Sequence, residues 1–136
     1  MYERILIPTD GSENVARAIE HGLTIAGQFG ASVHVLSVVP AIVKRDRLRH
    51  DPDEEAENAC EQVRQRAQRD GLDVVTEIRK GEPGEEILAY SEENDIDAIV
   101  MGTHGRSGAE RVILGSVAEE VVRNAPIPVM TVHQEE

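Results

Sequence analysis

Glycines that could hold a phosphate gather in one part of the sequence. Residues 102–108 read Gly-Thr-His-Gly-Arg-Ser-Gly and follow an apolar run, and Gly115-Ser116 precede a helix-like segment. Glycine tolerates positive φ and lets backbone N–H groups come close to an anion. The N-terminus of a following helix adds partial positive charge. The pattern therefore predicts an anion site to which Gly115 and Ser116 contribute free N–H groups and a hydroxyl.

The same stretch has a second interpretation, which the motif shape leaves open. A glycine-rich turn followed by a helix cap has a similar composition, and Ser116 with Glu119 forms a capping-box pattern. Arg106 and Arg111 are the bases of this segment and would neutralise a phosphate locally. His104 is more typical of a solvent-facing loop histidine than of a general base.

Asp10 also has two interpretations. It lies in residues 8–12, Pro-Thr-Asp-Gly-Ser, directly after the apolar run Ile5-Leu6-Ile7. Its carboxylate would cap the first helix, with Glu13 three residues on. Alternatively, it would face a ligand pocket and accept a hydrogen bond from an adenine or a ribose. The sequence does not separate these two roles.

Other kinds of site find little support. Cys60 is the only cysteine, which excludes an intramolecular disulfide and a cysteine metal cluster. The five histidines show no metal-ligand spacing. No Ser–His–Asp arrangement surrounds Ser12, and a Walker lysine and an obvious base to activate water are missing. We therefore expect no dedicated enzyme.

Two kinds of segment alternate along the chain. Short apolar runs predict strands at 5–7, 33–39, 74–78, 98–101 and 129–132. Helical patterns with start and stop signals lie at 12–29, 51–71, 83–94 and 116–124. Strict alternation implies parallel strands and right-handed crossovers. We expect an α/β fold over residues 1–136, a single doubly wound five-stranded parallel sheet with helices on both faces. Ligands bind beyond the carboxyl ends of such strands.

Composition limits the partners and the compartment. The 26 acids against 14 bases give a net charge of −12, which argues against nucleic acid and anionic lipid as partners. No apolar run approaches the roughly 20 residues of a membrane span, and signal-peptide anatomy is missing. We therefore expect a cytoplasmic protein. Lys44 and Lys80 are the only lysines, so a high-salt host and an ordinary acidic protein stay open as alternatives.

These motifs together resemble the universal stress protein family, in its ATP-binding branch. Gly102-x2-Gly105-x9-Gly115-Ser116 is similar to the nucleotide-binding signature of that family. Residues 5–12, 99–106, 114–117 and 125–132 resemble its first strand and loop, its fourth strand, its last helix start and its closing strand. The resemblance covers essentially the whole chain.

The resemblance implies strand order 3-2-1-4-5 and binding of ATP together with Mg²⁺ or Mn²⁺, whose ligands it leaves unassigned. It implies an adenine pocket near Asp10 and the backbone of Val38, and phosphates held by Gly102, Gly105, Gly115 and Ser116. The expected nucleotide contacts are Pro8, Thr9, Asp10, Val38, Met101, Gly102, Gly105, Arg106, Gly115, Ser116 and Val117.

Family members are typically homodimers paired through the last strand. The residues agree, because the segment from Ile127 to His133 would be an apolar edge strand, and such an edge invites pairing with a second copy. We expect a homodimer through this edge.

The leading hypothesis is an ATP-binding stress-response or regulatory factor that acts through its nucleotide-bound state. Bound ATP would order the glycine segment and residues 41–50, which changes the surface offered to a partner. The alternatives are a slow ATPase or self-phosphorylating enzyme with Ser107 or Ser116 as acceptor, a nucleotide-free dimeric scaffold, and a binder of AMP or a cyclic nucleotide. The downstream partner is not predicted.

Overall fold

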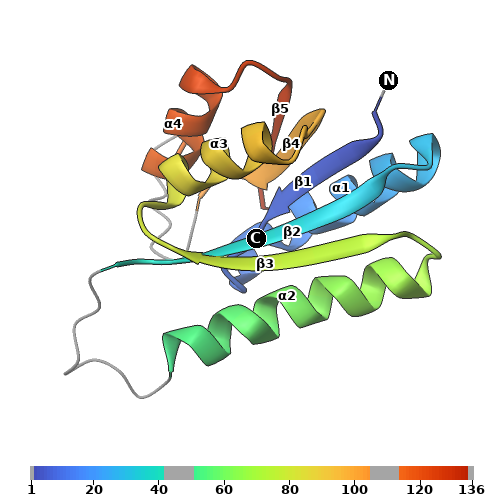
Figure 1. Cartoon of the computed structure of the whole chain (residues 1–136), viewed down its shortest axis with the longest axis horizontal. Helices are drawn as coiled ribbons and strands as arrows, with labels where there is room; N and C mark the ends of the chain where they lie inside the picture. The colour runs from blue at the N-terminus through green and yellow to red at the C-terminus, as the bar shows by residue number, and fades with distance from the viewer. Residues whose placement is uncertain (1, 42–50, 105–113, 135–136) are drawn as a thin grey trace.

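The computed structural model describes residues 2–41, 51–104 and 114–134. Strands and helices alternate along these residues, as the apolar pattern predicts (Figure 1). The strands are β1 (Arg4–Pro8), β2 (Ser32–Val39), β3 (Val74–Lys80), β4 (Ala98–Gly102) and β5 (Val129–Val132). The helices are the 3-10 turn η1 (Glu13–Val15), α1 (Ala16–Phe29), α2 (Pro52–Arg69), α3 (Pro83–Glu93) and α4 (Ser116–Asn124).

The five strands form one parallel sheet in the order β3-β2-β1-β4-β5. β1 lies at the centre, where Ile5 pairs with Val33 of β2 on one side and with Ala98 of β4 on the other. The chain adds β2 and β3 on one side of β1 and then crosses to add β4 and β5 on the other. The predicted fold class and strand order are confirmed.

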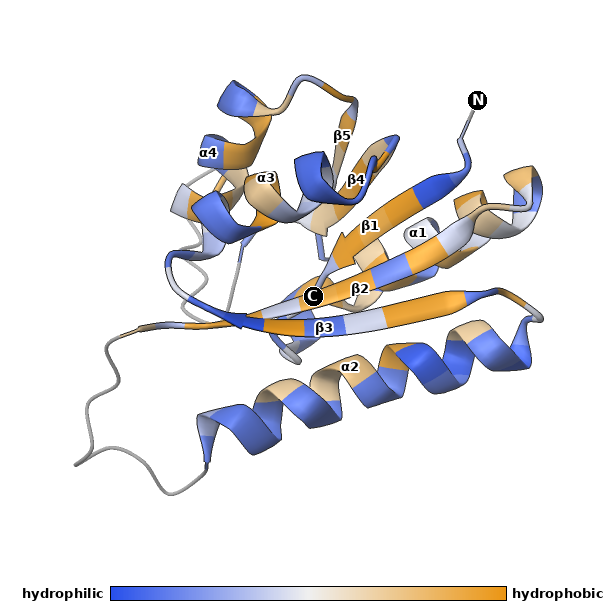
Figure 2. Ribbon diagram, viewed as in Figure 1, coloured by the Kyte–Doolittle hydropathy of each residue, from blue (hydrophilic) through white to orange (hydrophobic). Residues whose placement is uncertain are grey.

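Helices cover both faces of the sheet, and alternate residues of β1 point to opposite layers. Ile5 and Ile7 are fully buried in the core that α1 and α2 close. Leu6 is fully buried in the second core, under α3 and α4. Figure 2 shows the apolar strands enclosed between helices whose outer sides are hydrophilic. Burial on both faces explains why the strands read as short continuous apolar runs.

Helix starts differ in part from the predictions. Asp51 caps α2 as expected, because its carboxylate accepts the Asp53 N–H at 2.9 Å. The first helix, predicted from residue 12, opens instead with η1, and α1 begins at Ala16. The predicted capping role of Ser116 is wrong, because Gly115 is the N-cap residue and Ser116 is the first helical residue.

β3 runs two residues beyond its predicted end at residue 78. Its last residues, Arg79 and Lys80, pair with Val38 and Val39 of β2. Arg79 is also held by the carboxylates of Glu77 and Glu93. Tertiary pairing therefore extends a strand whose own sequence turns polar.

α2, with 18 residues, is the longest described helix, and charged side chains dominate it. None of the described helices combines the length and the apolar character that a bilayer crossing requires.

Candidate functional site

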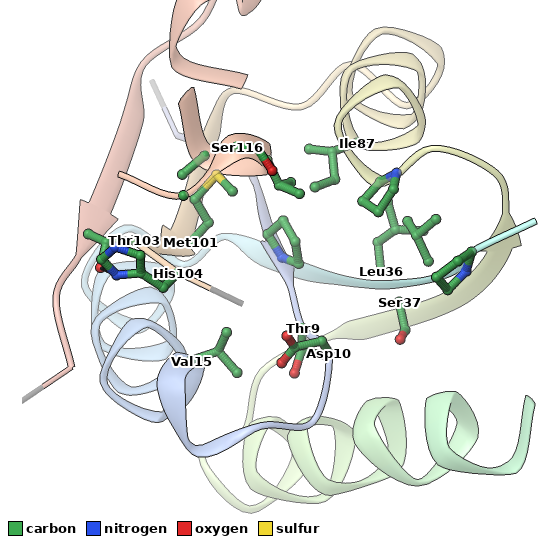
Figure 3. Close-up of a pocket in the computed structure, with 18 of the residues that line it drawn as sticks. Thr9, Asp10, Val15, Leu36, Ser37, Ile87, Met101, Thr103, His104 and Ser116 are labelled. Carbon is green, nitrogen blue, oxygen red and sulfur yellow. Dashed lines mark hydrogen bonds between the residues drawn. The ribbon is translucent and has the colours of Figure 1, made fainter. Parts of the chain in front are cut away.

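A large cavity opens at the carboxyl ends of β1, β2 and β4, between the two helix layers. Its volume is about 740 Å³. The N-terminal turns of α2, α3 and α4 contribute Pro52, Pro83 and Ser116 to its wall. Figure 3 shows Ser116 and Ile87 on one side of the cavity and Thr9 and Asp10 on the other. The cavity lies where the strand order reverses, which is the preferred ligand position in open α/β sheets.

The predicted nucleotide contacts converge on this cavity. Those within the described residues all line it, and they are Pro8, Thr9, Asp10, Val38, Met101, Gly102, Gly115, Ser116 and Val117. The two remaining predicted contacts, Gly105 and Arg106, lie outside the described residues. The wall of the cavity therefore combines residues from three strand ends and one helix start. These residues lie up to 109 positions apart in the sequence.

The loop after β1 is held by its own side chains. Thr9 Oγ1 accepts the Gly11 N–H at 3.1 Å, and Asp10 Oδ1 accepts the Ser12 N–H at 2.9 Å. Gly11 has a φ of 78°, a left-handed conformation that suits glycine. Asp10 thus fixes the turn before η1 and also lines the cavity. Its predicted role as the cap of the first helix is wrong, because Ser12 is the N-cap residue of η1 and Val15 is that of α1. Ser12 Oγ is buried and makes no cap hydrogen bond.

The glycines near the end of β4 permit close approach of backbone to backbone. A Cβ on Gly102 would lie 3.0 Å from the carbonyl oxygen of Asn14, and one on Gly115 would lie 3.3 Å from that of Thr103. The Gly115 N–H donates to the Thr103 carbonyl at 2.7 Å. The expectation of a free N–H at Gly115 is therefore wrong, because this N–H ties the start of α4 to Thr103, the residue that follows β4. The next N–H groups of α4, from Ser116 onward, are the ones without a partner inside the helix.

Both acidic and basic side chains occur among the described residues of the cavity wall. Three carboxylates line it, those of Asp10, Glu55 and Glu119, whereas His104 is the one basic side chain among the described lining residues. The N-terminal turns of α2, α3 and α4 add partial positive charge from their backbone dipoles. Of the described residues, the helix N-termini and His104 are therefore the groups that suit an anionic ligand.

Sequence reasoning missed most of the apolar wall and the position of His104. Leu36, Val39 and Ile87 line the cavity, and such surfaces commonly enclose a flat ring. In a doubly wound sheet the helix N-termini lie at the same edge as the strand C-termini, and this rule could have identified the α2 and α3 residues. His104, expected to face solvent, is half-buried and lines the cavity, and its Nδ1 lies 3.0 Å from Thr103 Oγ1.

The remaining reactive groups lie away from this cavity. Cys60 is buried on α2, and burial raises the pKa of its thiol to about 11, so it is a poor nucleophile. Within residues 2–41, 51–104 and 114–134, no three histidine, cysteine or acidic side chains are grouped to hold a metal ion.

Comparison with known proteins decides the family. The model of the universal stress protein family matches residues 1–133. The chain belongs to the universal stress protein family. Universal stress protein MJ0531 of Methanocaldococcus jannaschii is 39% identical over 97% of this chain and 82% of its own length.

Solved structures of universal stress proteins share this fold. The structure of protein MJ0577 superposes with a TM-score of 0.87 at 31% identity and covers 100% of this chain and 99% of its own. Universal stress protein UspA from Lactobacillus plantarum has a TM-score of 0.81 at 30% identity, covering 97% of this chain and 98% of its own. Two more distant structures with the same fold, 24% and 22% identical, are universal stress proteins in complex with cAMP and with dAMP.

Proposed function

We propose that this universal stress protein binds ATP in the cavity at the carboxyl ends of β1, β2 and β4. The observation that carries the proposal is the convergence of the glycine-motif residues Gly102, Gly115 and Ser116 with Asp10 and Val38 on one cavity of about 740 Å³. The apolar wall suits the adenine ring, and the α4 N-terminus suits a phosphate. The same fold holds adenine nucleotides in the cAMP and dAMP complexes of other family members.

A divalent ion, Mg²⁺ or Mn²⁺, would be carried mainly by the triphosphate. The described residues lack a cluster of three metal ligands, but the Asp10 and Glu119 carboxylates line the cavity. Mg²⁺ commonly combines one or two carboxylates with phosphate oxygens and water. The donor set therefore fits an ion bound with the nucleotide. The ion would neutralise phosphate charge beside these acids.

We propose that nucleotide occupancy is the signal through which the protein acts in a stress response. One nucleotide-binding unit over residues 1–136 would present different surfaces with and without ATP. The buried free thiol of Cys60 is consistent with a reducing cytoplasm as its compartment.

We also propose a homodimer formed through the β5 edge. β5 ends the sheet on one side, and Met130 on it is 43% exposed. Val122 on the neighbouring α4 is 46% exposed. An edge strand with exposed apolar side chains gains most from pairing with a second copy.

The first test is the nucleotide content of the purified protein. We would purify the chain gently, denature it and identify the released nucleotide by chromatography and mass, and then measure the melting temperature against ATP with Mg²⁺. Released ATP, or a melting temperature that rises with ATP concentration as linkage requires, supports the proposal. Protein without nucleotide and without a thermal shift, at both low and high salt, contradicts it and favours a nucleotide-free scaffold.

Gly115→Val tests whether the phosphates bind at the start of α4. The added side chain would meet the Thr103 carbonyl and block the approach of phosphate to the α4 N-terminus. ATP binding should be lost while the oligomeric state stays that of the wild type. A Gly115→Val protein that keeps wild-type ATP affinity would place the phosphates elsewhere.

A further inference from the structure

The hydroxyl of Thr103 lies between two imidazole rings. Thr103 Oγ1 is 3.0 Å from His104 Nδ1 and 3.4 Å from His133 Nδ1. The two rings face each other edge to face with centroids 6.3 Å apart. A threonine hydroxyl has one proton to donate and can also accept, so it can link two imidazoles in series. Thr103 itself is buried, with 7% of its surface exposed.

This group is anchored to the fold at three points. The Thr103 carbonyl accepts the Gly115 N–H at 2.7 Å, which ties it to the start of α4. The His133 carbonyl accepts from Arg17 Nη1 of α1 at 2.8 Å. The residue that follows His133 accepts the Arg17 N–H through its side chain at 3.1 Å. The backbone segments that carry the two imidazoles are therefore fixed to α1 and to the start of α4.

The His104 ring lies beside the start of α4. A Cβ built on Gly115 would be 3.7 Å from His104 Cδ2, the carbon bonded to Nε2. The Cδ2 side of the ring thus borders the N-cap residue, while Nδ1 lies within hydrogen-bond distance of the Thr103 hydroxyl. Figure 3 shows Thr103 and His104 together at the end of the cavity opposite Leu36 and Ser37.

The chemistry of the imidazole suits the position of His104 in the wall. The whole chain has a net charge of −12, so a basic side chain at the ligand site favours the binding of an anion. Among the described lining residues, His104 alone offers a basic side chain. A phosphate oxygen at the α4 N-terminus would accept from its imidazole, and a charge-assisted hydrogen bond is stronger than a neutral one.

We propose that His104, oriented by the Thr103 hydroxyl and by His133, recognises the phosphate end of the nucleotide and gives the site its preference for phosphorylated over unphosphorylated nucleosides. This inference rests on the proposed nucleotide-binding function. His104 is then a ligand-binding residue, and Thr103 and His133 are positioning residues that hold its ring.

The test is a ligand series measured by calorimetry on the wild-type chain and on His104→Gln, His133→Gln and His21→Gln. The ligands are adenosine, AMP, ADP and ATP. His21 is on α1 and is absent from the cavity wall. Its Nδ1 lies 2.8 Å from the Arg17 carbonyl, whereas the Arg17 N–H and guanidinium hold the β5 end, so His21→Gln controls for the loss of an imidazole that touches the anchor but not the cavity. Melting temperatures without ligand show whether each variant folds as the wild type does.

We expect His104→Gln to weaken ATP and ADP by about tenfold, as for the loss of a hydrogen bond to a charged group. Its adenosine affinity should change less than twofold. His133→Gln should lower the ratio of ATP to adenosine affinity in the same direction by a smaller factor, which a merely structural role would not do. His21→Gln should match the wild type.

Several results would overturn the inference. They are an equal loss for adenosine and ATP in His104→Gln, and an unchanged ATP affinity. If His104→Gln does not fold, the ¹⁵N shifts of the His104 ring in the wild-type chain decide, since they should move with ADP and ATP and stay fixed with adenosine. Wild-type protein that binds none of the four ligands would instead refute the proposed function itself.

Discussion

His34 Nδ1 lies 2.6 Å from the hydroxyl oxygen of Tyr90, and this buried contact joins β2 to α3. Burial lowers the pKa of His34, and the nearby Arg4 lowers it further. The neutral imidazole can accept a hydrogen bond from the phenolic hydroxyl, so both polar groups have a partner without a buried charge. Arg79 covers the Tyr90 ring, with its guanidinium carbon 5.1 Å from the ring centroid, and pairs with Glu93.

The His34–Tyr90 pair predicts loss of stability in mild acid. The folded-state pKa of His34 is depressed below its ordinary value of 6.5, so the unfolded chain binds more protons as the pH falls. The contribution of His34 to stability is therefore complete above about pH 6.5 and declines as the pH falls through the folded pKa. Urea unfolding between pH 8 and pH 5 measures it, with His34→Gln as the reference.

Two comparisons decide that prediction. The difference in unfolding free energy between wild type and His34→Gln should shrink from pH 8 to pH 5, and a constant difference would contradict the linkage. Tyr90→Phe should cost about 1–3 kcal/mol at pH 8, because it leaves a buried imidazole nitrogen without its donor.

Asp10 should show both of its roles in one pair of variants. Asp10→Ala removes the acceptor of the Ser12 N–H and should lower stability by about 1 kcal/mol, the usual contribution of one hydrogen bond. Asp10→Asn keeps an oxygen acceptor and removes only the charge. If the carboxylate binds the nucleotide, both variants lose ATP affinity, whereas only Asp10→Ala loses stability without ligand. Equal melting-point losses with and without ATP would leave Asp10 only its role in the turn before η1.

The fold was predictable because its signals are local and repeated. Ile5, Leu6 and Ile7 are apolar because both faces of β1 are covered, and the Asp51–Pro52 pair starts α2 where its capping chemistry requires. Helix starts at η1 and α4 were less predictable. Gly115 takes the cap position because its backbone bonds to Thr103, a contact that no local pattern encodes.

The cavity was predictable where recognisable residue types follow β1 and β4, so Asp10 and Gly102 were identified. Val38 was identified through the resemblance to the family. Leu36 and Ile87 are ordinary apolar residues in sequence, and only the tertiary arrangement turns part of their surface toward the cavity. The Thr103–His133 contact joins residues 30 positions apart through the β4–β5 pairing, so the environment of His104 depends on tertiary structure.

Gly102 should be required by packing rather than by backbone conformation. A Cβ there would lie 3.0 Å from the Asn14 carbonyl oxygen and 3.2 Å from Val15 Cγ1. Gly102→Ala should therefore destabilise the chain by about 1–3 kcal/mol, the usual cost of overpacking. Gly27, on α1, is the matched control, because a Cβ there meets nothing within 4 Å.

Gly27→Ala should stabilise the chain by about 0.4–1 kcal/mol, since alanine reduces the entropy of the unfolded state and favours a helix. Chemical denaturation of both variants measures the two effects. A Gly102→Ala chain that is as stable as the Gly27→Ala chain would contradict the prediction. It would mean that the end of β4 has room for a methyl group despite the nearby Asn14 carbonyl.

The two edges of the sheet offer a matched test of the proposed dimer. Met130 on β5 is 43% exposed and Val75 on β3 is 47% exposed, so a lysine at either position meets a similar environment in the monomer. If two copies pair through β5, Met130→Lys places two like charges near the interface and should shift the chain to monomer. Val75→Lys, on the far edge, should leave the assembly unchanged, and each substitution should alter monomer stability by less than about 0.5 kcal/mol. Light scattering over a concentration series gives the mass of each protein. A wild-type monomer, or equal dissociation by both variants, would contradict pairing through β5, whereas loss of the dimer in Met130→Lys alone assigns the interface to that strand.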